Sequence, residues 1–373
     1  MSTPDTDVET VVIGAGLCGL ATALLLVESG RPVRVLEARD VPGGRIRSVF
    51  DDKSGDTLAD LGPTWIWPSF QPVVARWVEK LGLTLFAQFE SGNAVLDYGP
   101  GSDPEYRFLP GQLGNMRVAG GLQAMIDRLV AMLPEDVLLT NAPIRTVTTD
   151  GLGVTLDLSS DEFPHLSCER VIVAVPPRVA VETIDWIPEL PAALTCALEA
   201  TPTWMAPHAK VVALYETPFW REKGLSGRIA SQAGPIVEGH DHCGVDGLPA
   251  ALFGFIGWPH DMRVEAGTDL KQHVQAQLLR CFGPGSPEPL SIQIEDWASD
   301  PLVARAPDLT GPGVHPEVGP QILRQPHADG GVWFAGSETA RQSPGLVEGA
   351  FDAAEQTVAA ILRTDSAVAA ETV

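Results

Sequence analysis

Positive charge is scarce in this chain of 373 residues. Lysine and arginine together number 25 against 48 aspartates and glutamates, which gives a formal net charge of −23 at pH 7. Binding to nucleic acid or to an anionic membrane surface requires clusters of basic residues. The composition therefore argues against both kinds of partner, and we interpret the excess of acidic residues as favouring solubility.

Cysteines are also few, and long apolar runs are missing. The five cysteines, at positions 18, 168, 196, 243 and 281, are odd in number and form no CxxC pair, which argues against a disulfide framework or a zinc ribbon. No stretch approaches the roughly 18 uninterrupted apolar residues of a membrane span. The first ten residues are polar and acidic, unlike a signal peptide. We therefore expect a cytoplasmic protein without a membrane anchor.

A dinucleotide-binding pattern is present near the N-terminus. The apolar run 8–13 leads into the sequence GAGLCG at 14–19, an Ala/Leu-rich stretch that ends near Gly30, and a second apolar run at 33–36. In such a strand–turn–helix unit Gly14 allows the tight turn, Gly16 lets a pyrophosphate approach the backbone, and Gly19 lets the helix pack closely on the sheet. The acidic residue that follows the second strand, Glu37, is expected to bind ribose hydroxyls.

A second glycine-rich turn follows Glu37 and narrows the choice of dinucleotide. Arg39 leads through Pro42 to Gly43, Gly44 and Arg45. A second loop that faces phosphate suits a cofactor whose pyrophosphate and ribityl chain are both enclosed, whereas NAD alone needs only the first loop. The pattern thus favours FAD.

Several blocks along the chain resemble the flavin-dependent amine oxidases, the monoamine and polyamine oxidase family. In order these are LGPTW at 61–65, GGL at 120–122, NAPI at 141–144, VIVAVPP at 171–177, HAK at 208–210, PFWR at 218–221, EDWASDP at 295–301, VWFAGSE at 332–338 and PGLVEGA at 344–350. The resemblance covers nearly the whole chain and is weakest at 72–111 and 222–290. It implies oxidation of an amine by hydride transfer to flavin N5, reoxidation by O2 to give H2O2, and hydrolysis of the imine.

The order of the cofactor blocks predicts an α/β fold with a discontinuous Rossmann-like FAD-binding domain. We assign 1–71, 112–188 and 299–364 to this domain, and 72–111 and 189–298 to a smaller α+β substrate domain. The last helix is expected from Pro344 to about Leu362, followed by a frayed tail at 365–373.

The resemblance also implies which residues bind FAD. The backbone N–H of Val347, at the start of the last helix, would face the pyrimidine end of the flavin. The full set of expected cofactor-binding residues is Gly14, Ala15, Gly16, Cys18, Gly19, Glu37, Ala38, Arg39, Gly43, Gly44, Arg45, Gly62, Pro63, Thr64, Trp65, Ile144, Ala174, Trp297, Gly336, Ser337, Glu338, Leu346 and Val347.

Lys210 is the candidate catalytic residue. It begins an apolar run in which Lys210, Val212 and Leu214 alternate with residues of the opposite face. An ammonium group in such a strand is costly to bury unless it is paired or loses its proton. The resemblance places the matching lysine beside flavin N5 through a water. A strand-edge lysine that extends to solvent is the alternative interpretation.

Departures from the family pattern leave the activity partly open. Two aromatic rings usually face the flavin in this family, and the corresponding positions fall here near Pro307 and on Leu346, neither of which is aromatic. Ala306 stands where some members have the cysteine that links flavin covalently. Noncovalent FAD is therefore implied, with Trp65, Trp67 and Leu346 as candidate lining of the substrate cavity; core packing is the alternative for the two tryptophans. A flavin desaturase or dehydrogenase with a non-amine substrate or another electron acceptor remains an alternative, as does a flavin-binding module without turnover.

A short cluster at 240–243, with the sequence HDHC, superficially resembles a metal site. It lies between Gly239 and Gly244 and has no second pair of ligands at a recognisable spacing. We predict a solvated turn there and no bound metal. The identity of the substrate and the oligomeric state do not follow from the sequence.

Overall fold

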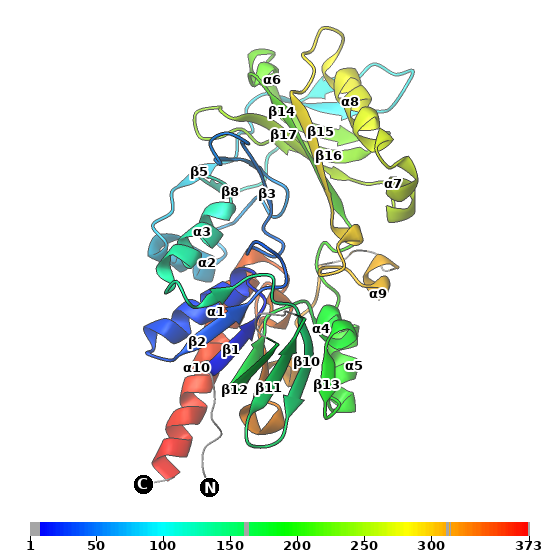
Figure 1. Ribbon diagram of the computed structural model, residues 1–373. Helices are drawn as coiled ribbons and strands as arrows, with labels where there is room; N and C mark the ends of the chain where they lie inside the picture. The colour runs from blue at the N-terminus through cyan, green and yellow to red at the C-terminus, as the bar shows by residue number, and fades with distance from the viewer. Residues whose placement is uncertain (1–7, 160–163, 311–312, 314, 372–373) are drawn as a thin grey trace.

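The computed structural model describes residues 8–159, 164–310, 313 and 315–371. Two lobes, each built on one large sheet, form an elongated molecule (Figure 1). The described part of the chain has no helix with the length and apolar character needed to cross a membrane.

The sheet of the first lobe has eight strands in the order β13-β10-β11-β12-β1-β2-β9, with β19 paired to β12. The pairs β1–β2, β1–β12 and β12–β19 are parallel, whereas β11 runs antiparallel to both β10 and β12. The bounds are β1 (Val8–Ile13), β2 (Val33–Leu36), β9 (Leu138–Leu139), β10 (Ile144–Thr149), β11 (Val154–Leu158), β12 (His165–Val173), β13 (Asp185–Ile187) and β19 (Val332–Phe334).

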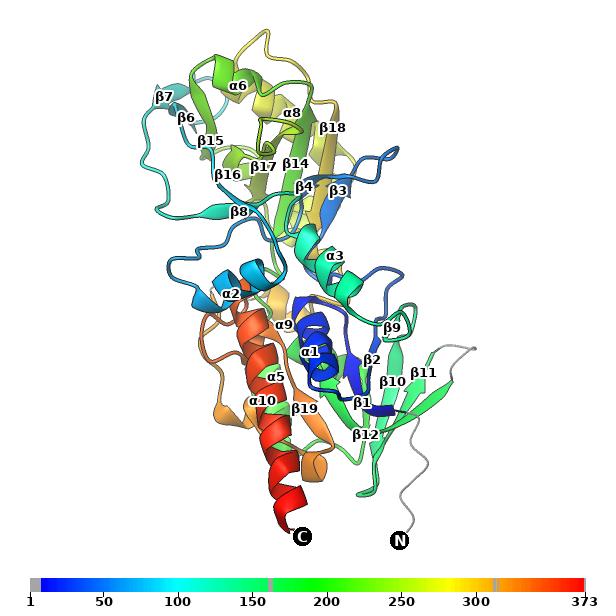
Figure 2. The ribbon, with the colours of Figure 1, turned by 90° about the vertical axis from the view of Figure 1, so that its left-hand side faces the viewer.

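Helices cover both faces of this sheet, which explains why β1 and β12 end in the uninterrupted apolar runs 11–13 and 171–173. Val12 packs with α1 (Leu17–Glu28), α3 (Gln123–Met132) and α10 (Val347–Glu371), and Figure 2 shows α10 running beside α1. Val11 and Ile13 point to the opposite face, where they pack with α4 (Pro177–Thr183) and α5 (Ala192–Ala200). The α/β fold class and the predicted first strand and helix are confirmed.

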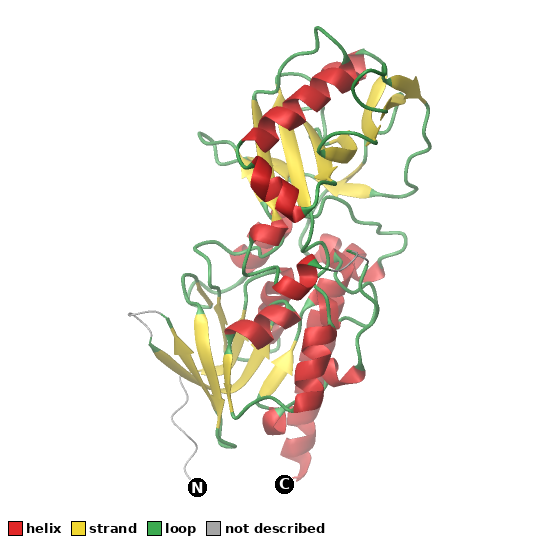
Figure 3. Cartoon of the chain, turned by 90° about the vertical axis from the view of Figure 1, so that its right-hand side faces the viewer, coloured by secondary structure: helices red, strands yellow, loops and turns green. Residues whose placement is uncertain are grey.

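The sheet of the second lobe has seven strands in the order β18-β14-β17-β16-β15-β6-β7. One of its faces is covered by α8 (Asp269–Phe282), through residues such as Val274 and Leu278, next to α7 (His260–Ala266) (Figure 3). The bounds are β6 (Asn93–Asp97), β7 (Glu105–Arg107), β14 (Ala209–Tyr215), β15 (Leu225–Ser231), β16 (Ile236–Asp241), β17 (Ala250–Ile256) and β18 (Ser291–Asp296), with α6 (Phe219–Glu222) after β14.

Two small antiparallel pairs connect the lobes. They are β3 (Ser48–Phe50) with β4 (Thr57–Asp60), and β5 (Leu85–Ala87) with β8 (Met116–Val118). Ala59 and Leu61 pack against Val212 and Phe253, on the face of the second lobe's sheet that α8 does not cover. The alternation predicted for the strand that begins at Lys210 is confirmed, because Val212 and Leu214 pack in this cluster, whereas Val211 and Ala213 pack on the side of α8.

Helix α2 (Pro72–Lys80) belongs to the first lobe, in contrast to its expected place in the substrate domain. The Trp77 ring stacks on the ring of Phe351 in α10, with the ring centres 4.6 Å apart. The Glu348 carboxylate accepts hydrogen bonds from the N–H groups of Val73 and Val74 at 3.1 and 2.6 Å. Helix α5, at the start of the second expected substrate segment, likewise packs in the first lobe. An amphipathic helix shows in sequence that it has a buried face, but its partner is set by the tertiary fold.

The C-terminal helix is longer than expected. It continues to Glu371, so the prediction of a helix end near Leu362 and of a frayed tail from 365 is wrong as far as Glu371; residues 372 and 373 lie outside the described residues. Alanine-rich sequence favours the extension. The Asp365 carboxylate anchors it, accepting hydrogen bonds from Arg31 at 2.7 Å and from Arg170 at 2.9 and 3.0 Å.

The segment 240–243 is buried, so the prediction of a solvated turn there is wrong. His240 and Asp241 end β16, and the side chains of His242 and Cys243 have no exposed surface. Asp241 accepts hydrogen bonds from the Trp220 indole at 2.8 Å and from Arg221 at 2.7 and 2.8 Å. His242 Nε2 accepts from the backbone N–H of Asp60 at 2.8 Å. These polar groups hold the second lobe together and join it to β4.

Candidate active site

A cavity of about 390 Å³ lies between the lobes and brings the predicted residues together. Its walls come from the β1–α1 turn, the loops after β2 and β4, the start of β14 and the start of α10. Every expected cofactor-binding residue lines it except Ala15 and Gly19. Residues that are distant in sequence therefore form one continuous site.

The glycine turn has the conformation that the sequence pattern requires. Gly14 has a φ of +100°, and a Cβ atom there would lie 2.8 Å from Val175 Cγ1. A Cβ on Gly19 would lie 1.9 Å from the Gly14 carbonyl oxygen. Gly14 thus permits the turn, and Gly19 permits the close approach of α1 to the strand, as the sequence predicts.

The N-terminus of α1 has the features of an anion-binding site. The helix begins after Gly16 without a side-chain cap, and its first turn contains no acidic residue. Gly16, Leu17 and Cys18 line the cavity there, and Gly43 from the second glycine turn donates a backbone hydrogen bond to Ala15 at 2.9 Å. Unpaired N–H groups and the positive end of the helix dipole fit a pyrophosphate at this point.

Glu37 is fixed at the end of β2 with its carboxylate on the cavity wall. Its Oε2 accepts a hydrogen bond from the Ala15 N–H at 2.8 Å, and its Oε1 accepts from the Arg39 N–H at 3.0 Å. Arg39 itself pairs with Asp300 at 2.7 Å. Each Glu37 oxygen keeps a lone pair available, so the carboxylate fits a ribose with two hydroxyl donors.

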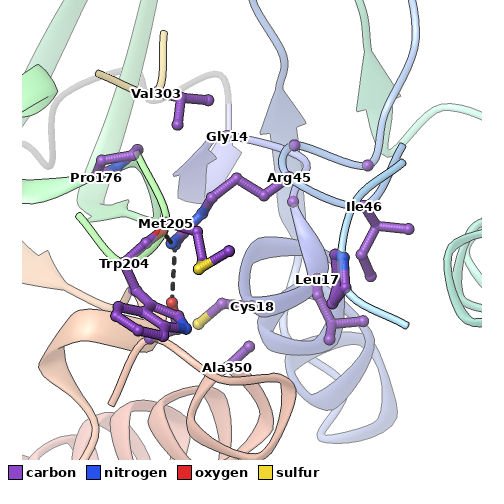
Figure 4. A pocket seen from close by; sticks show the side chains of 18 of the residues that line it. Gly14, Leu17, Cys18, Arg45, Ile46, Pro176, Trp204, Met205, Val303 and Ala350 are labelled. Carbon is purple, nitrogen blue, oxygen red and sulfur yellow. Dashed lines mark hydrogen bonds between the residues drawn. The ribbon is translucent and has the colours of Figure 1, made fainter. Parts of the chain in front are cut away.

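Arg45 extends across the cavity toward Trp204 (Figure 4). Its guanidinium pairs with Glu338 at 2.7 Å and donates hydrogen bonds to Ser337 Oγ at 2.9 Å and to the Trp204 carbonyl at 3.2 Å. Although burial opposes ionisation, Arg45 and Ser337 lower the pKa of the Glu338 carboxyl. The two turns predicted to contact the cofactor are therefore joined by an ion pair.

Lys210 is the second residue of β14, and it lines the cavity. Its side chain is only 3% exposed. The ammonium donates hydrogen bonds to the Gly62 carbonyl at 2.8 Å and to Thr64 Oγ1, and it lies 4.2 Å from the centre of the Phe253 ring. Within the described structure Lys210 is thus a buried, oriented group, in contrast to the alternative of a lysine that extends to solvent.

Burial lowers the pKa of Lys210 to about 7. Asp60 opposes this shift and Arg117 adds to it. Asp60 is itself buried, and it accepts hydrogen bonds from Ser48 Oγ at 3.2 Å and from the Leu122 N–H at 3.0 Å. Asp60 and Arg117 were not anticipated from the sequence, although each lies in a short strand next to a matched block.

The far wall of the cavity is largely aromatic. Trp65 and Trp67 pack edge to face with ring centres 6.4 Å apart, and the Trp65 indole N–H donates to Gln88 Oε1 at 2.8 Å. Both tryptophans line the cavity, and Trp65 also packs against the cluster that contains Ala59 and Val212, so the two interpretations are compatible for Trp65. Leu346 lies on the wall as expected, whereas Pro307 is part of the short helix α9 (Ala306–Leu309) and is absent from the described lining.

Several lining residues lie outside the set expected from the sequence, and Trp204, Met205 and His208 are among them. Trp204, Met205 and His208 precede β14 and reach the cavity, with the Trp204 and His208 ring centres 6.2 Å apart. His208 belongs to the matched block at 208–210, and Trp204 and Met205 lie shortly before it, so the position next to Lys210 was the available signal.

A Rossmann-like turn that opens on a large cavity between two lobes defines the class of a dinucleotide-dependent oxidoreductase. The family model described as flavin containing amine oxidoreductase matches residues 17–110 and 103–362. The chain belongs to this family and is a flavin-dependent, amine oxidase-like oxidoreductase.

Individual relatives are similar over most of their length. A probable flavin-containing monoamine oxidase A of Dictyostelium discoideum is 28% identical, with 92% of this chain and 95% of the relative covered. A putrescine oxidase of Kocuria rosea is 26% identical over 59% of this chain and 66% of the relative.

Solved structures confirm the fold. Cyclohexylamine oxidase from Brevibacterium oxydans IH-35A superposes with a TM-score of 0.80 at 20% identity, covering 96% of this chain and 100% of the other. Putrescine oxidase bound to putrescine gives a TM-score of 0.78 at 23% identity, covering 95% and 99%.

Proposed function

We propose that this chain is an amine oxidase that binds FAD noncovalently and uses O2 as electron acceptor. The flavin, when bound, supplies a two-electron acceptor for the hydride on the carbon next to the amine nitrogen; O2 then takes up the electrons as H2O2, and water hydrolyses the released imine. The observation that carries the proposal is Lys210, a buried and oriented amine on the wall of the cavity where family membership predicts the flavin.

In this proposal, different residues of the cavity wall bind different parts of the cofactor. The N-terminus of α1 binds the pyrophosphate and Glu37 binds the adenosine ribose. The Gly336–Glu338 turn and the N–H groups at the start of α10, near Val347, stabilise the flavin and the negative charge on its reduced ring.

Lys210 serves as the proton-exchanging group of the cavity. With a pKa of about 7, its amine both holds and releases a proton near neutral pH, which is the condition for general acid–base catalysis. Its protonated form also disfavours a second cation nearby, so an amine substrate beside it is driven toward the neutral form that carries a free nitrogen lone pair.

Noncovalent binding is supported by the cysteine that does line the cavity. The Cys18 thiol donates a hydrogen bond to the Ala335 carbonyl at 2.9 Å, and burial raises its pKa to about 12. Because the thiolate is the reactive form, this cysteine is a poor nucleophile toward a flavin. The position expected for a linking cysteine is Ala306. Cys18, Cys196, Cys243 and Cys281 are free thiols, in keeping with a reducing cytoplasm as the proposed location.

The test is the variant Lys210→Met, with Lys271→Met on the exposed surface of α8 as the matched control. Met keeps the apolar stem and removes the ammonium, so we expect the affected half-reaction to slow by roughly 10²- to 10⁴-fold. Anaerobic stopped flow with an amine measures reduction, and mixing the reduced protein with O2 measures reoxidation. If both half-reactions of Lys210→Met match those of Lys271→Met, the catalytic role of Lys210 is wrong.

A flavin dehydrogenase or desaturase is the second candidate. It is favoured by Leu346, which is not aromatic, and by the position of Pro307 in α9 away from the described lining. Oxygen consumption with a panel of amines separates the two functions. Turnover that depends on an artificial electron acceptor and consumes no O2 would favour the dehydrogenase.

A further inference from the structure

We propose that Thr64 is a positioning residue that stays hydrogen-bonded to Lys210 in both protonation states of the lysine. The inference rests on the proposed function of Lys210 and deepens that function. The Thr64 hydroxyl would hold the amine in place while the amine gains and loses a proton. Thr64 is otherwise expected only to contact the cofactor.

The contacts around the lysine nitrogen are specific and few. Thr64 is 5% exposed and follows Gly62 and Pro63 in the loop after β4. Two of the three ammonium protons are used, one by the Gly62 carbonyl at 2.8 Å and one by Thr64 Oγ1. The third is left for the cavity that Lys210 lines. Among the described residues, Thr64 Oγ1 has no other hydrogen-bond partner.

The two acceptors differ in chemistry. A carbonyl oxygen can only accept, whereas a hydroxyl group can accept or donate. When Lys210 is charged, Thr64 Oγ1 accepts a hydrogen bond from it. When Lys210 is neutral, its nitrogen carries a lone pair, and the Thr64 O–H donates to that lone pair while Gly62 still accepts one N–H. The hydroxyl rotor reverses the direction of the bond without moving either heavy atom.

Charged groups near the lysine act at longer range. Asp60 and Arg117 influence its pKa in opposite directions, and His242 beside Asp60 is held neutral because burial lowers its pKa to about 3. Glu295 stands opposite Lys210 on β18 and lies 3.7 Å from Arg47. The ammonium donates no hydrogen bond to Asp60, His242 or Glu295 in the described structure. Thr64 is therefore the side chain through which the position of the amine can be tested.

The pair of variants Thr64→Val and Thr64→Ser isolates the hydroxyl. Valine has nearly the same shape but removes the group, whereas serine restores it. A hydrogen bond to the charged lysine is stronger than one to the neutral lysine. Its loss therefore destabilises the charged form more, and the pKa of Lys210 should fall by about one unit in Thr64→Val. Thr64→Ser should return it to the wild-type value.

The measurement is an NMR titration of the protein labelled with ¹³C at lysine Cε. The chain has five lysines, at 53, 80, 210, 223 and 271, so each resonance can be followed from pH 5 to 11 with the other four as internal references. The signal of Lys210 is assigned by its disappearance in Lys210→Met. The pH profile of flavin reduction provides a second readout and should shift by the same amount.

An unchanged Lys210 titration in Thr64→Val, with an unchanged pH profile, would overturn the proposal. The NMR readout is independent of turnover, so the two levels of inference separate. If Thr64→Val lowers the pKa while Lys210→Met oxidises amines at the wild-type rate, the contact of Thr64 with Lys210 stands and the catalytic role of Lys210 falls.

Discussion

Burial of Lys210 makes the stability of the folded protein depend on pH. The unfolded chain holds the lysine proton up to its ordinary pKa of 10.5, whereas the folded protein releases it near 7. Below pH 7 both states are protonated, so the folded state carries the full penalty of a buried ammonium. Between these two values the unfolded state binds more protons, and stability therefore rises with pH.

The variant Lys210→Met lacks this titration and provides the reference. Lys210 also lowers the pKa values of Asp60 and His242, but both groups titrate well below this pH window. Within the window, the difference in unfolding free energy between wild type and Lys210→Met therefore isolates one residue. We expect wild type to gain on the variant by about 1.4 kcal/mol per pH unit within this window, and by several kcal/mol in total. In Lys210→Met, the Gly62 carbonyl and the Thr64 hydroxyl lose their hydrogen-bond partner. This loss changes the unfolding free energy of the variant by an amount that does not depend on pH.

The assay is urea denaturation of both proteins from pH 6 to 10, with flavin removed or present at the same saturating concentration because a bound ligand stabilises the native state. Equal slopes of unfolding free energy against urea concentration would show that the two proteins undergo comparable unfolding transitions. A free-energy difference that stays constant across this range, or that moves against wild type as pH rises, would refute the assignment of Lys210 as a buried lysine with a lowered pKa.

Three further outcomes follow from the same structure. Purified protein should be yellow and should release FAD on acid or heat denaturation; flavin that stays with the precipitated polypeptide would contradict noncovalent binding. Glu37→Ala removes the acceptor for the ribose hydroxyls. Loss of charge-assisted bonds of about 1.5–3 kcal/mol should weaken FAD binding by roughly 10- to 100-fold in titrations of the apoprotein. An unchanged affinity would show that Glu37 does not bind the ribose. Asp365→Ala breaks the contacts with Arg31 and Arg170 at the end of α10, and thermal unfolding should show a loss of about 1 kcal/mol; unchanged stability would mean that helix propensity alone holds this turn.

The N-terminal unit was predictable because its determinants are local. The strand Val8–Ile13, the turn at Gly14 and the second strand Val33–Leu36 occur where the apolar runs and glycines place them. Gly14 and Gly19 are required by contacts within this unit or with its neighbouring strand. A motif that encodes its own geometry in this way can be interpreted from one sequence.

The segment 240–243 shows where such local interpretation ends. Four polar or sulfur-containing residues between two glycines are typical of an exposed turn. Here they are buried because Trp220 and Arg221 satisfy Asp241, and because the backbone of Asp60 satisfies His242. The partner of His242 lies 182 positions away. No periodicity within the segment carries that information, since a hydrogen bond across the fold leaves no local pattern.

The same limit applies to the chemistry of Lys210. Its strand and its face follow from alternation along β14, and its proposed role rests on the resemblance to the family, but its proton affinity depends on groups from other elements. Asp60 comes from β4, Arg117 from β8, and the Thr64 hydroxyl from the loop after β4. Replacement of any one of them would leave the lysine block at 208–210 unchanged while altering what the amine does at neutral pH. The lysine block alone therefore does not determine the proton affinity of the amine, which depends also on the loop that holds it.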